Sequence, residues 1–137
     1  MLALLLAGLV FARAASDTMH ISKPEVGSEI TAAIEAQLAA FRAGDVARAY
    51  SYSAAGFRGQ TSLPAFARMV RQNYPEIWAN TRAEFNLVRD DGAKARLIVH
   101  VFTKTGDASY DYVLFKEEAG WRIGGVLRHE TRKSDAV

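Results

Sequence analysis

The spacing of the apolar residues changes partway along the chain, and this change constrains the fold more than any other feature. In the first half, apolar side chains recur every three or four residues, as in Ile30, Ile34, Leu38 and Phe41. This repeat places them in one stripe, about 80° wide, of an amphipathic helix. From residue 82 onward apolar residues alternate with polar ones, which is typical of strands. The order predicts an α+β domain whose helices come first and pack on one face of a sheet.

Capping signals divide the first half into helices. Ser28 is suited to cap the first helix, Gly44 to end it, and Asp45 to cap a second, shorter helix over residues 46–52. Residues 53–60 contain two glycines and are predicted to form a loop.

A third helix and four strands follow. Ser62 or Thr61 caps the helix, Pro64 fits its first turn, and Pro75 ends it because the residue before a proline disfavours the helical conformation. The second half predicts an antiparallel meander of four strands joined by three short turns. The strands are expected from residue 82 to about 87 and over 97–103, 110–115 and 121–127, with turns at 90–92, 106–107 and 119–120.

Composition limits the number of domains and the available chemistry. The 137 residues suffice for one domain and not for two. Without cysteine the chain has no disulfide, thiolate nucleophile or cysteine-ligated metal, and its three dispersed histidines disfavour a transition-metal site. The 17 basic and 15 acidic residues are interleaved, which gives no support to nucleic-acid binding. We expect no cofactor.

The N-terminus is typical of a secretory signal peptide. Residues 2–12 form an uncharged apolar run that leads into the small–x–small triplet Ala12-Arg13-Ala14. The run is too short for a comfortable membrane span of about 20 residues. A buried first helix and an uncleaved anchor are the alternatives. We expect a signal peptide at 1–14, a flexible leader at 15–27, the domain at 28–130 and a tail at 131–137, with the cleaved chain periplasmic or secreted and without a stable membrane span.

Both faces of the central strands are apolar. By alternation, Leu97, Val99 and Val101 point to one face, and Ile98 and Phe102 to the other. One face can accept the helices, and a contiguous apolar patch on the second would mark an interaction surface. We hypothesise that the protein forms a homodimer that buries this outer face of the sheet.

Three stretches resemble a known superfamily. Residues 33–45 (AIEAQLAAFRAGD) and 120–125 (GWRIGG) resemble the opening helix pair and the last strand of the nuclear-transport-factor-2-like superfamily, which includes ketosteroid isomerase and the SnoaL-like cyclases. Residues 66–75 (FARMVRQNYP) are similar to a narrower group, domain-of-unknown-function family 4864. The resemblance covers residues 28–127. It implies a cystatin-like, cone-shaped roll in which three helices pack on a curved four-stranded antiparallel sheet, with a cavity at the open end.

Two residues are candidates for catalysis in such a cone. An isomerase of this shape needs a carboxylate base and an acidic donor such as a phenol. Asp111 lies mid-strand between Tyr110 and Tyr112, and His100 lies in an apolar strand. Each has a structural alternative: Asp111 paired with an arginine on the sheet, and His100 packed and hydrogen-bonded.

Aromatic residues with a polar tip are expected to line the mouth of the cone. They suit a pocket for a flat or apolar molecule, and they equally suit ordinary packing with the polar tip at the surface. The candidates are Tyr50, Tyr52, Tyr74, Trp78 and Tyr112.

Three functions follow as hypotheses. The first is an exported, non-catalytic module that binds a small apolar or aromatic ligand or a protein partner through its cone or its sheet. The second is an isomerase, dehydratase or cyclase that uses Asp111 or His100 with a tyrosine donor. The third is a purely structural dimerisation domain. The lack of a complete catalytic set favours the first.

Overall fold

The computed structural model describes residues 18–129, so the predicted signal peptide and tail lie outside the described residues. The α+β class is confirmed. The helices are α2 (Pro24–Arg42), α3 (Val46–Ser51), α4 (Ala55–Gln60), α5 (Leu63–Asn73) and α6 (Pro75–Trp78). The strands are β1 (His20–Ile21), β2 (Arg82–Phe85), β3 (Arg89–Asp90), β4 (Lys94–Phe102), β5 (Asp107–Glu117) and β6 (Gly120–Arg128).

The longest helix, α2, begins four residues before the predicted cap. Lys23 is its N-cap and Pro24 its first residue. Proline is tolerated there because the first N–H group of a helix makes no hydrogen bond within the helix. Ser28 therefore lies in the second turn. The described part of the predicted leader, residues 18–27, contains β1 and the start of α2. The apolar stripe that begins at Ile30 is buried along the whole helix, as predicted.

Two predicted caps are confirmed, and one predicted loop is wrong. The Asp45 side chain accepts a hydrogen bond from the backbone N–H of Arg48 at 3.0 Å and caps α3, and Ser62 caps α5. Residues 55–60, predicted to be a loop, form α4. This helix buries no residue, so it has no apolar stripe to reveal it. The first N–H group of α4 donates instead to the carboxylate of Glu117, 62 positions away in the sequence.

The sheet has six antiparallel strands rather than the four predicted. Their order is β1-β3-β4-β5-β6, and β2 also pairs with β4. The first predicted strand, from residue 82 to about 87, forms β2 as far as Phe85, and β3 lies beyond it, overlapping the predicted turn at 90–92. The β2 strand pairs with the end of β4, and β3 pairs with its beginning. Two-residue strands such as β1 and β3 are too short to show alternation, which explains why the sequence pattern missed them.

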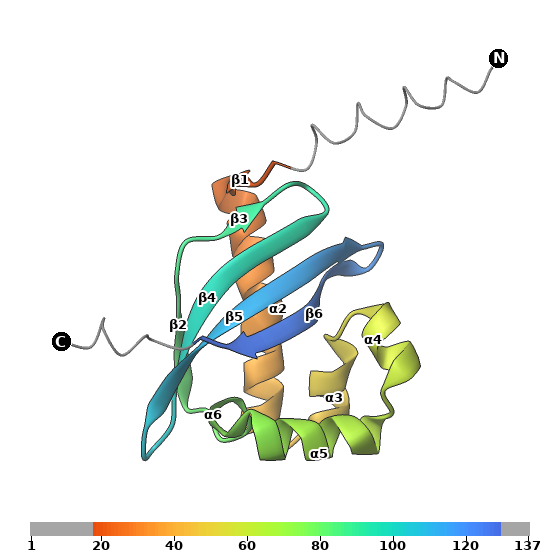
Figure 1. Ribbon diagram of the computed structural model, residues 1–137, viewed down its shortest axis with the longest axis vertical. Helices are drawn as coiled ribbons and strands as arrows, with labels where there is room; N and C mark the ends of the chain where they lie inside the picture. The colour runs from red at the N-terminus through yellow and green to blue at the C-terminus, as the bar shows by residue number, and fades with distance from the viewer. Residues whose placement is uncertain (1–17, 130–137) are drawn as a thin grey trace.

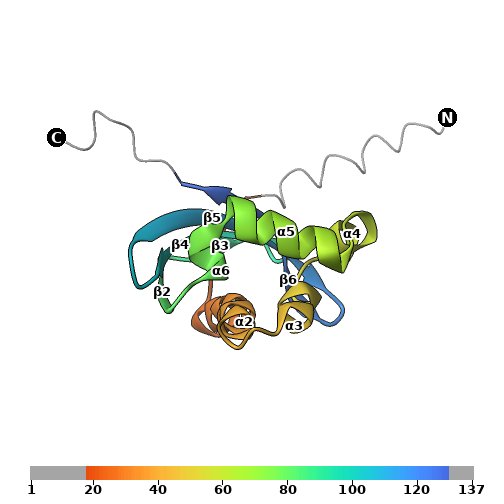
Figure 2. The same cartoon turned by 90° about the horizontal axis from the view of Figure 1, so that it is seen from below.

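The sheet curves over two of the helices. Figure 2 shows α2 and α3 on its concave side, and Figure 1 shows α5 and α6 crossing one end. The predicted alternation in β4 is confirmed: Val99 and Val101 are fully buried on the inner face, whereas Ile98 and Phe102 on the outer face are half-buried. The core lies between this inner face and α2.

A β-bulge interrupts the pairing of β5 with β6. Val113 pairs with Gly125 and Leu114 with Ile123, so Gly124 has no partner of its own. The ring of Phe115 lies so close to Gly124 that a Cβ atom there would overlap it. Glycine therefore allows this close approach of ring and backbone.

We predict that Gly124→Ala lowers the free energy of unfolding by about 1–2 kcal/mol, because the added methyl group overlaps the Phe115 ring. The loss should shrink to roughly 0.5 kcal/mol or less when Phe115 is also replaced by Ala. Urea unfolding of the wild type, both single variants and the double variant measures this coupling. Gly56→Ala, where a Cβ atom meets nothing within 4 Å, is the matched control and should not destabilise. An undiminished loss in the double variant would contradict the steric explanation.

Candidate functional site

A cavity of about 220 Å³ lies where the helices meet the last strand. Its wall is formed by α2, the α3–α4 connection, α4, α5, α6 and β6. The lining residues are Gln37, Phe41, Ser53, Phe57, Phe66, Met69, Val70, Tyr74, Ile77, Ile123, Gly124, Gly125 and Val126. None of them is Asp, Glu, His, Lys or Arg, so the wall carries no formal charge at neutral pH.

Two buried polar side chains interrupt this apolar wall. Gln37 and Ser53 are 4% and 3% exposed. Gln37 Nε2 donates a hydrogen bond to the carbonyl oxygen of Ala49 at 3.1 Å. Because that partner can only accept, the amide nitrogen must face Ala49, and Oε1 faces elsewhere. Within residues 18–129, no protein group donates to Gln37 Oε1 or bonds to Ser53 Oγ, and neither atom is fully enclosed, so a water-sized molecule can reach both.

Local structure explains how both groups reach the cavity. Gln37 lies three residues after Ile34 and four before Phe41, so it belongs to the buried stripe of α2. A polar residue within an apolar stripe is a signal that sequence analysis could have used. Ser53 is held against β6 because the backbone groups of Ile123 bond to the residues on either side of Ser53 at 2.8 Å each. No local pattern marks that position.

One of the five predicted pocket aromatics lines the cavity. The Tyr74 ring is part of the wall, and its hydroxyl donates to the carbonyl of Val126 at 2.9 Å. The other four lie elsewhere. The Tyr50 hydroxyl donates to the carbonyl of Thr61 at 2.5 Å, and its ring packs on Phe66.

The remaining three aromatics take part in packing. The Tyr52 ring lies below the guanidinium group of Arg122, and Trp78 packs against Phe41. Tyr112 is fully buried on the inner face of β5, and its hydroxyl has no hydrogen-bond partner among the described residues. Burial raises the pKa of the Tyr112 phenol above its usual range.

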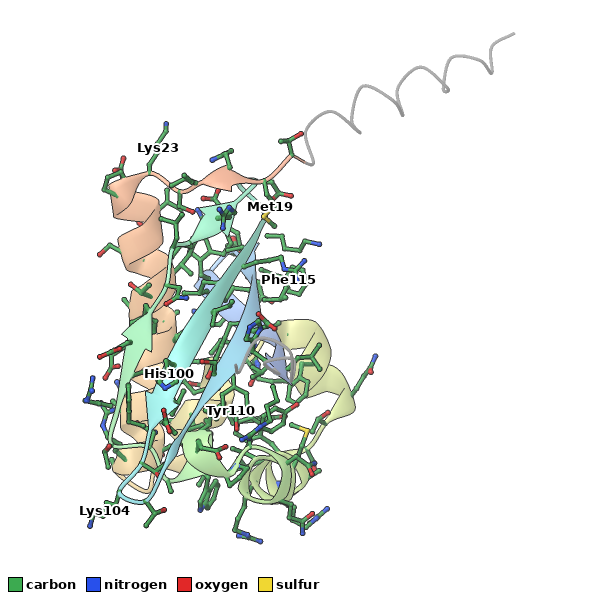
Figure 3. All side chains as sticks on the ribbon, turned by 60° about the vertical axis from the view of Figure 1, so that its left-hand side comes forward. Met19, Lys23, His100, Lys104, Tyr110 and Phe115 are labelled. Atoms are coloured by element: carbon green, nitrogen blue, oxygen red, sulfur yellow. The ribbon has the colours of Figure 1, made fainter. Side chains whose placement is uncertain are left out.

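Tyr110, two residues before Tyr112 on the same strand, has a different environment (Figure 3). Its hydroxyl donates to Glu76 Oε1 at 2.5 Å, and Arg128 Nη1 lies 2.9 Å from the same oxygen. Burial raises the pKa of Glu76, but hydrogen bonds from Tyr110 and Arg128 outweigh burial and leave this pKa below its usual value. Burial, together with the bond to Glu76, raises the pKa of Tyr110. This cluster ties β5 and β6 to α6.

The two candidate catalytic residues lie on the outer face of the sheet. Asp111 pairs with His129, with 3.1 Å between Oδ2 and Nδ1, and not with an arginine. His100, labelled in Figure 3, contacts Asp107 through Nε2 and Ser109 through Nδ1, each at 2.6 Å. Both aspartates and Ser109 come from alternate positions of β5, and none of these side chains lines the cavity. On the side of the sheet opposite the cavity, the His100 contacts join β4 to β5, and the Asp111–His129 pair joins β5 to the residue after β6.

We predict opposite effects for two matched variants at neighbouring inward positions of β5. Tyr112→Phe should leave the free energy of unfolding unchanged or raise it by up to about 1–3 kcal/mol, because it removes a buried hydroxyl without a partner. Tyr110→Phe should lower it by about 1–2 kcal/mol, because Glu76 loses a donor. Urea unfolding at neutral pH measures both, and equal losses would contradict this assignment.

Comparison with known families gives one match. The family model described as "Domain of unknown function (DUF4864)" matches residues 24–136, from the first residue of α2 onward. No curated protein matches the sequence. Within residues 18–129, no helix is both long enough and apolar enough to cross a lipid bilayer.

Proposed function

Because the chain belongs to the DUF4864 family, whose description names no reaction, we propose a function from its cavity. The protein is a non-catalytic module that binds one small, largely apolar ligand between its helices and β6. The observation that carries this proposal is a cavity of about 220 Å³ with an apolar, uncharged wall in a domain of this small size.

The volume limits the ligand to a compact molecule. An apolar cavity of about 150 Å³ admits benzene, whereas pockets for drug-sized molecules measure about 300–1,000 Å³. A cavity of about 220 Å³ therefore suits a single ring with one or two substituents. Phe57 and Phe66 belong to the wall and leave this space open, which favours ligand binding over the purely structural alternative.

The positions of the ionisable groups disfavour the enzyme alternative. Acid–base catalysis requires a titratable group within hydrogen-bond reach of the bound substrate. The cavity wall contains no carboxylate or imidazole, and Asp111 and His100 lie beyond the sheet. The one titratable side chain in the wall, Tyr74, donates its hydroxyl to a backbone carbonyl.

Two broader assignments remain proposals. Helices against the concave side of an antiparallel sheet support membership of the nuclear-transport-factor-2-like superfamily (Figure 2). The apolar run at residues 2–12, followed by Ala12-Arg13-Ala14, supports export and removal of residues 1–14. The ligand would then be one encountered in the periplasm or outside the cell.

Native mass spectrometry tests the binding function. Protein purified without denaturation from cells that express the whole chain should carry a co-purified or added molecule on the order of 100 Da, toluene being the added probe. Met69→Trp adds an indole to the cavity wall and should abolish this adduct. Arg68→Trp, exposed on the neighbouring position of α5, is the matched control and should keep it. The same spectrum reports the mass change expected from removal of residues 1–14.

Two results would reject ligand binding. One is wild-type protein that carries no adduct even with added toluene. The other is an adduct that Met69→Trp retains at the wild-type level, because the molecule would then lie outside the cavity.

A second proposal concerns the outer face of the sheet. Leu127 and Phe115 are 71% and 40% exposed there, and Asp111 separates Leu127 from the half-buried Ile98 in the same row of the sheet. Exposed apolar side chains on one sheet face favour a homodimer formed by two such faces. The dimer and the cavity ligand are compatible, because the cavity lies on the other side of the sheet.

We predict that Leu127→Glu converts the dimer to monomer at micromolar concentration, because it places a charge in the apolar contact. Sedimentation velocity measures the change. Gln72→Glu adds the same charge on α5, where the residue is exposed, and should leave the dimer intact. Wild-type protein that sediments as a monomer would remove this proposal.

A further inference from the structure

The unpartnered oxygen atoms of Gln37 and Ser53 define the chemistry of the cavity ligand. This inference rests on the proposed binding function and deepens it. Both side chains are more than nine-tenths buried, and both belong to the wall of the cavity. Neither oxygen is sealed from a water-sized molecule, because the fully enclosed atoms without a partner within residues 18–129 are Tyr112 Oη and Trp121 Nε1. A ligand that fills the cavity displaces water from both oxygens and must replace the hydrogen bonds of that water.

Gln37 can offer only an acceptor to the cavity. Its amide nitrogen is bound to the carbonyl of Ala49, so the remaining atom, Oε1, accepts hydrogen bonds and cannot donate them. Ala49 also accepts a hydrogen bond from the backbone N–H of Tyr52, so the amide of Gln37 is not the only support of that carbonyl. A ligand that engages Gln37 in the cavity must therefore carry an O–H or N–H donor.

Ser53 complements this requirement, because a hydroxyl group can either donate or accept. Its Oγ has no partner within residues 18–129. It can donate to a ligand oxygen or accept from a second ligand donor. A ligand hydroxyl, which is both donor and acceptor, satisfies the two groups at once.

The absence of formal charge in the wall limits the ligand further. A carboxylate or ammonium ion in this cavity would lose its hydration and gain no opposite charge. We propose that the cavity binds an uncharged molecule, about the size of a single ring, that bears a hydroxyl or N–H donor. Gln37 Oε1 accepts a hydrogen bond from this donor, and Ser53 Oγ forms a second hydrogen bond with the ligand. Gln37 and Ser53 are thus specificity-determining residues of the binding site.

Three probes of similar size test the inference by isothermal titration calorimetry of the full-length protein at neutral pH. They are toluene, phenol and benzoate, which offer no donor, one neutral hydroxyl and a carboxylate. If the phenol hydroxyl found no hydrogen-bond partner in the cavity, phenol would bind about 10-fold or more weakly than toluene. With Gln37 Oε1 as partner, phenol should bind at least as tightly as toluene. Benzoate should bind at least 100-fold more weakly than phenol.

Two variants assign the effect to the named atoms. Gln37→Met keeps the length of the side chain without its acceptor, and Ser53→Ala removes the hydroxyl. Gln37→Met should lower the affinity for phenol about tenfold, and Ser53→Ala about threefold. The affinity for toluene should change less than twofold in either variant. Ser51→Ala removes a hydroxyl from an exposed serine of α3 and is the matched control, with no change for either probe.

The outcomes separate this inference from the function on which it rests. Toluene binding with phenol tenfold weaker, or benzoate as tight as phenol, overturns the inference and leaves an apolar binding cavity. Equal losses of toluene and phenol affinity in Gln37→Met also overturn it, because Gln37 would then act only in packing. If neither toluene nor phenol binds, the proposed function falls together with the inference.

Discussion

The inner face of the sheet, buried against α2, is the contact on which the rest of the structure depends. Val99, Val101 and Leu114 on the sheet and the stripe of α2 that contains Ile34 are fully buried. Each such side chain contributes about 1.5–3 kcal/mol relative to exposure. The same burial fixes the rotation of α2, and Gln37 lies on the buried stripe. The burial that orients α2 therefore also places the amide group of Gln37 in the interior. It lies beside a cavity that the surrounding side chains do not fill.

Around that cavity the wall is built from segments that are far apart in the sequence. Gly124 and Gly125 contribute no side chains beyond Cα, and the bulge at Gly124 brings the Phe115 ring against the backbone from the outside. On the other side, α4 buries no residue, and its first N–H group is held by Glu117. Within α4, Phe57 packs against Phe66 and adds its ring to the cavity wall.

The two candidate catalytic side chains, Asp111 and His100, are separated from the cavity by the sheet. On β5, alternation sends Tyr110 and Tyr112 inward and Asp107, Ser109 and Asp111 outward. The position of Asp111 between two tyrosines makes it a candidate catalytic residue in the sequence, but those tyrosines face the other layer. His100 follows the same rule on β4, where Asp107 and Ser109 satisfy both of its ring nitrogens. These contacts hold both candidate catalytic side chains outside the cavity.

The sequence by itself determined the α+β class, the stripe of α2, the caps at Asp45 and Ser62 and the alternation in β4, because periodicity and capping are local and depend on near neighbours. It also contained the resemblance to DUF4864 that the family comparison confirmed. Only the tertiary structure decided the two short strands, α4, the place of each aromatic ring and the cavity. Each of these depends on a partner far away in the chain: β1 on β3, α4 on Glu117, and Ser53 on Ile123. The cavity is the space that the packed side chains leave unfilled, so it depends on residues distant in the sequence and cannot be predicted from a local pattern.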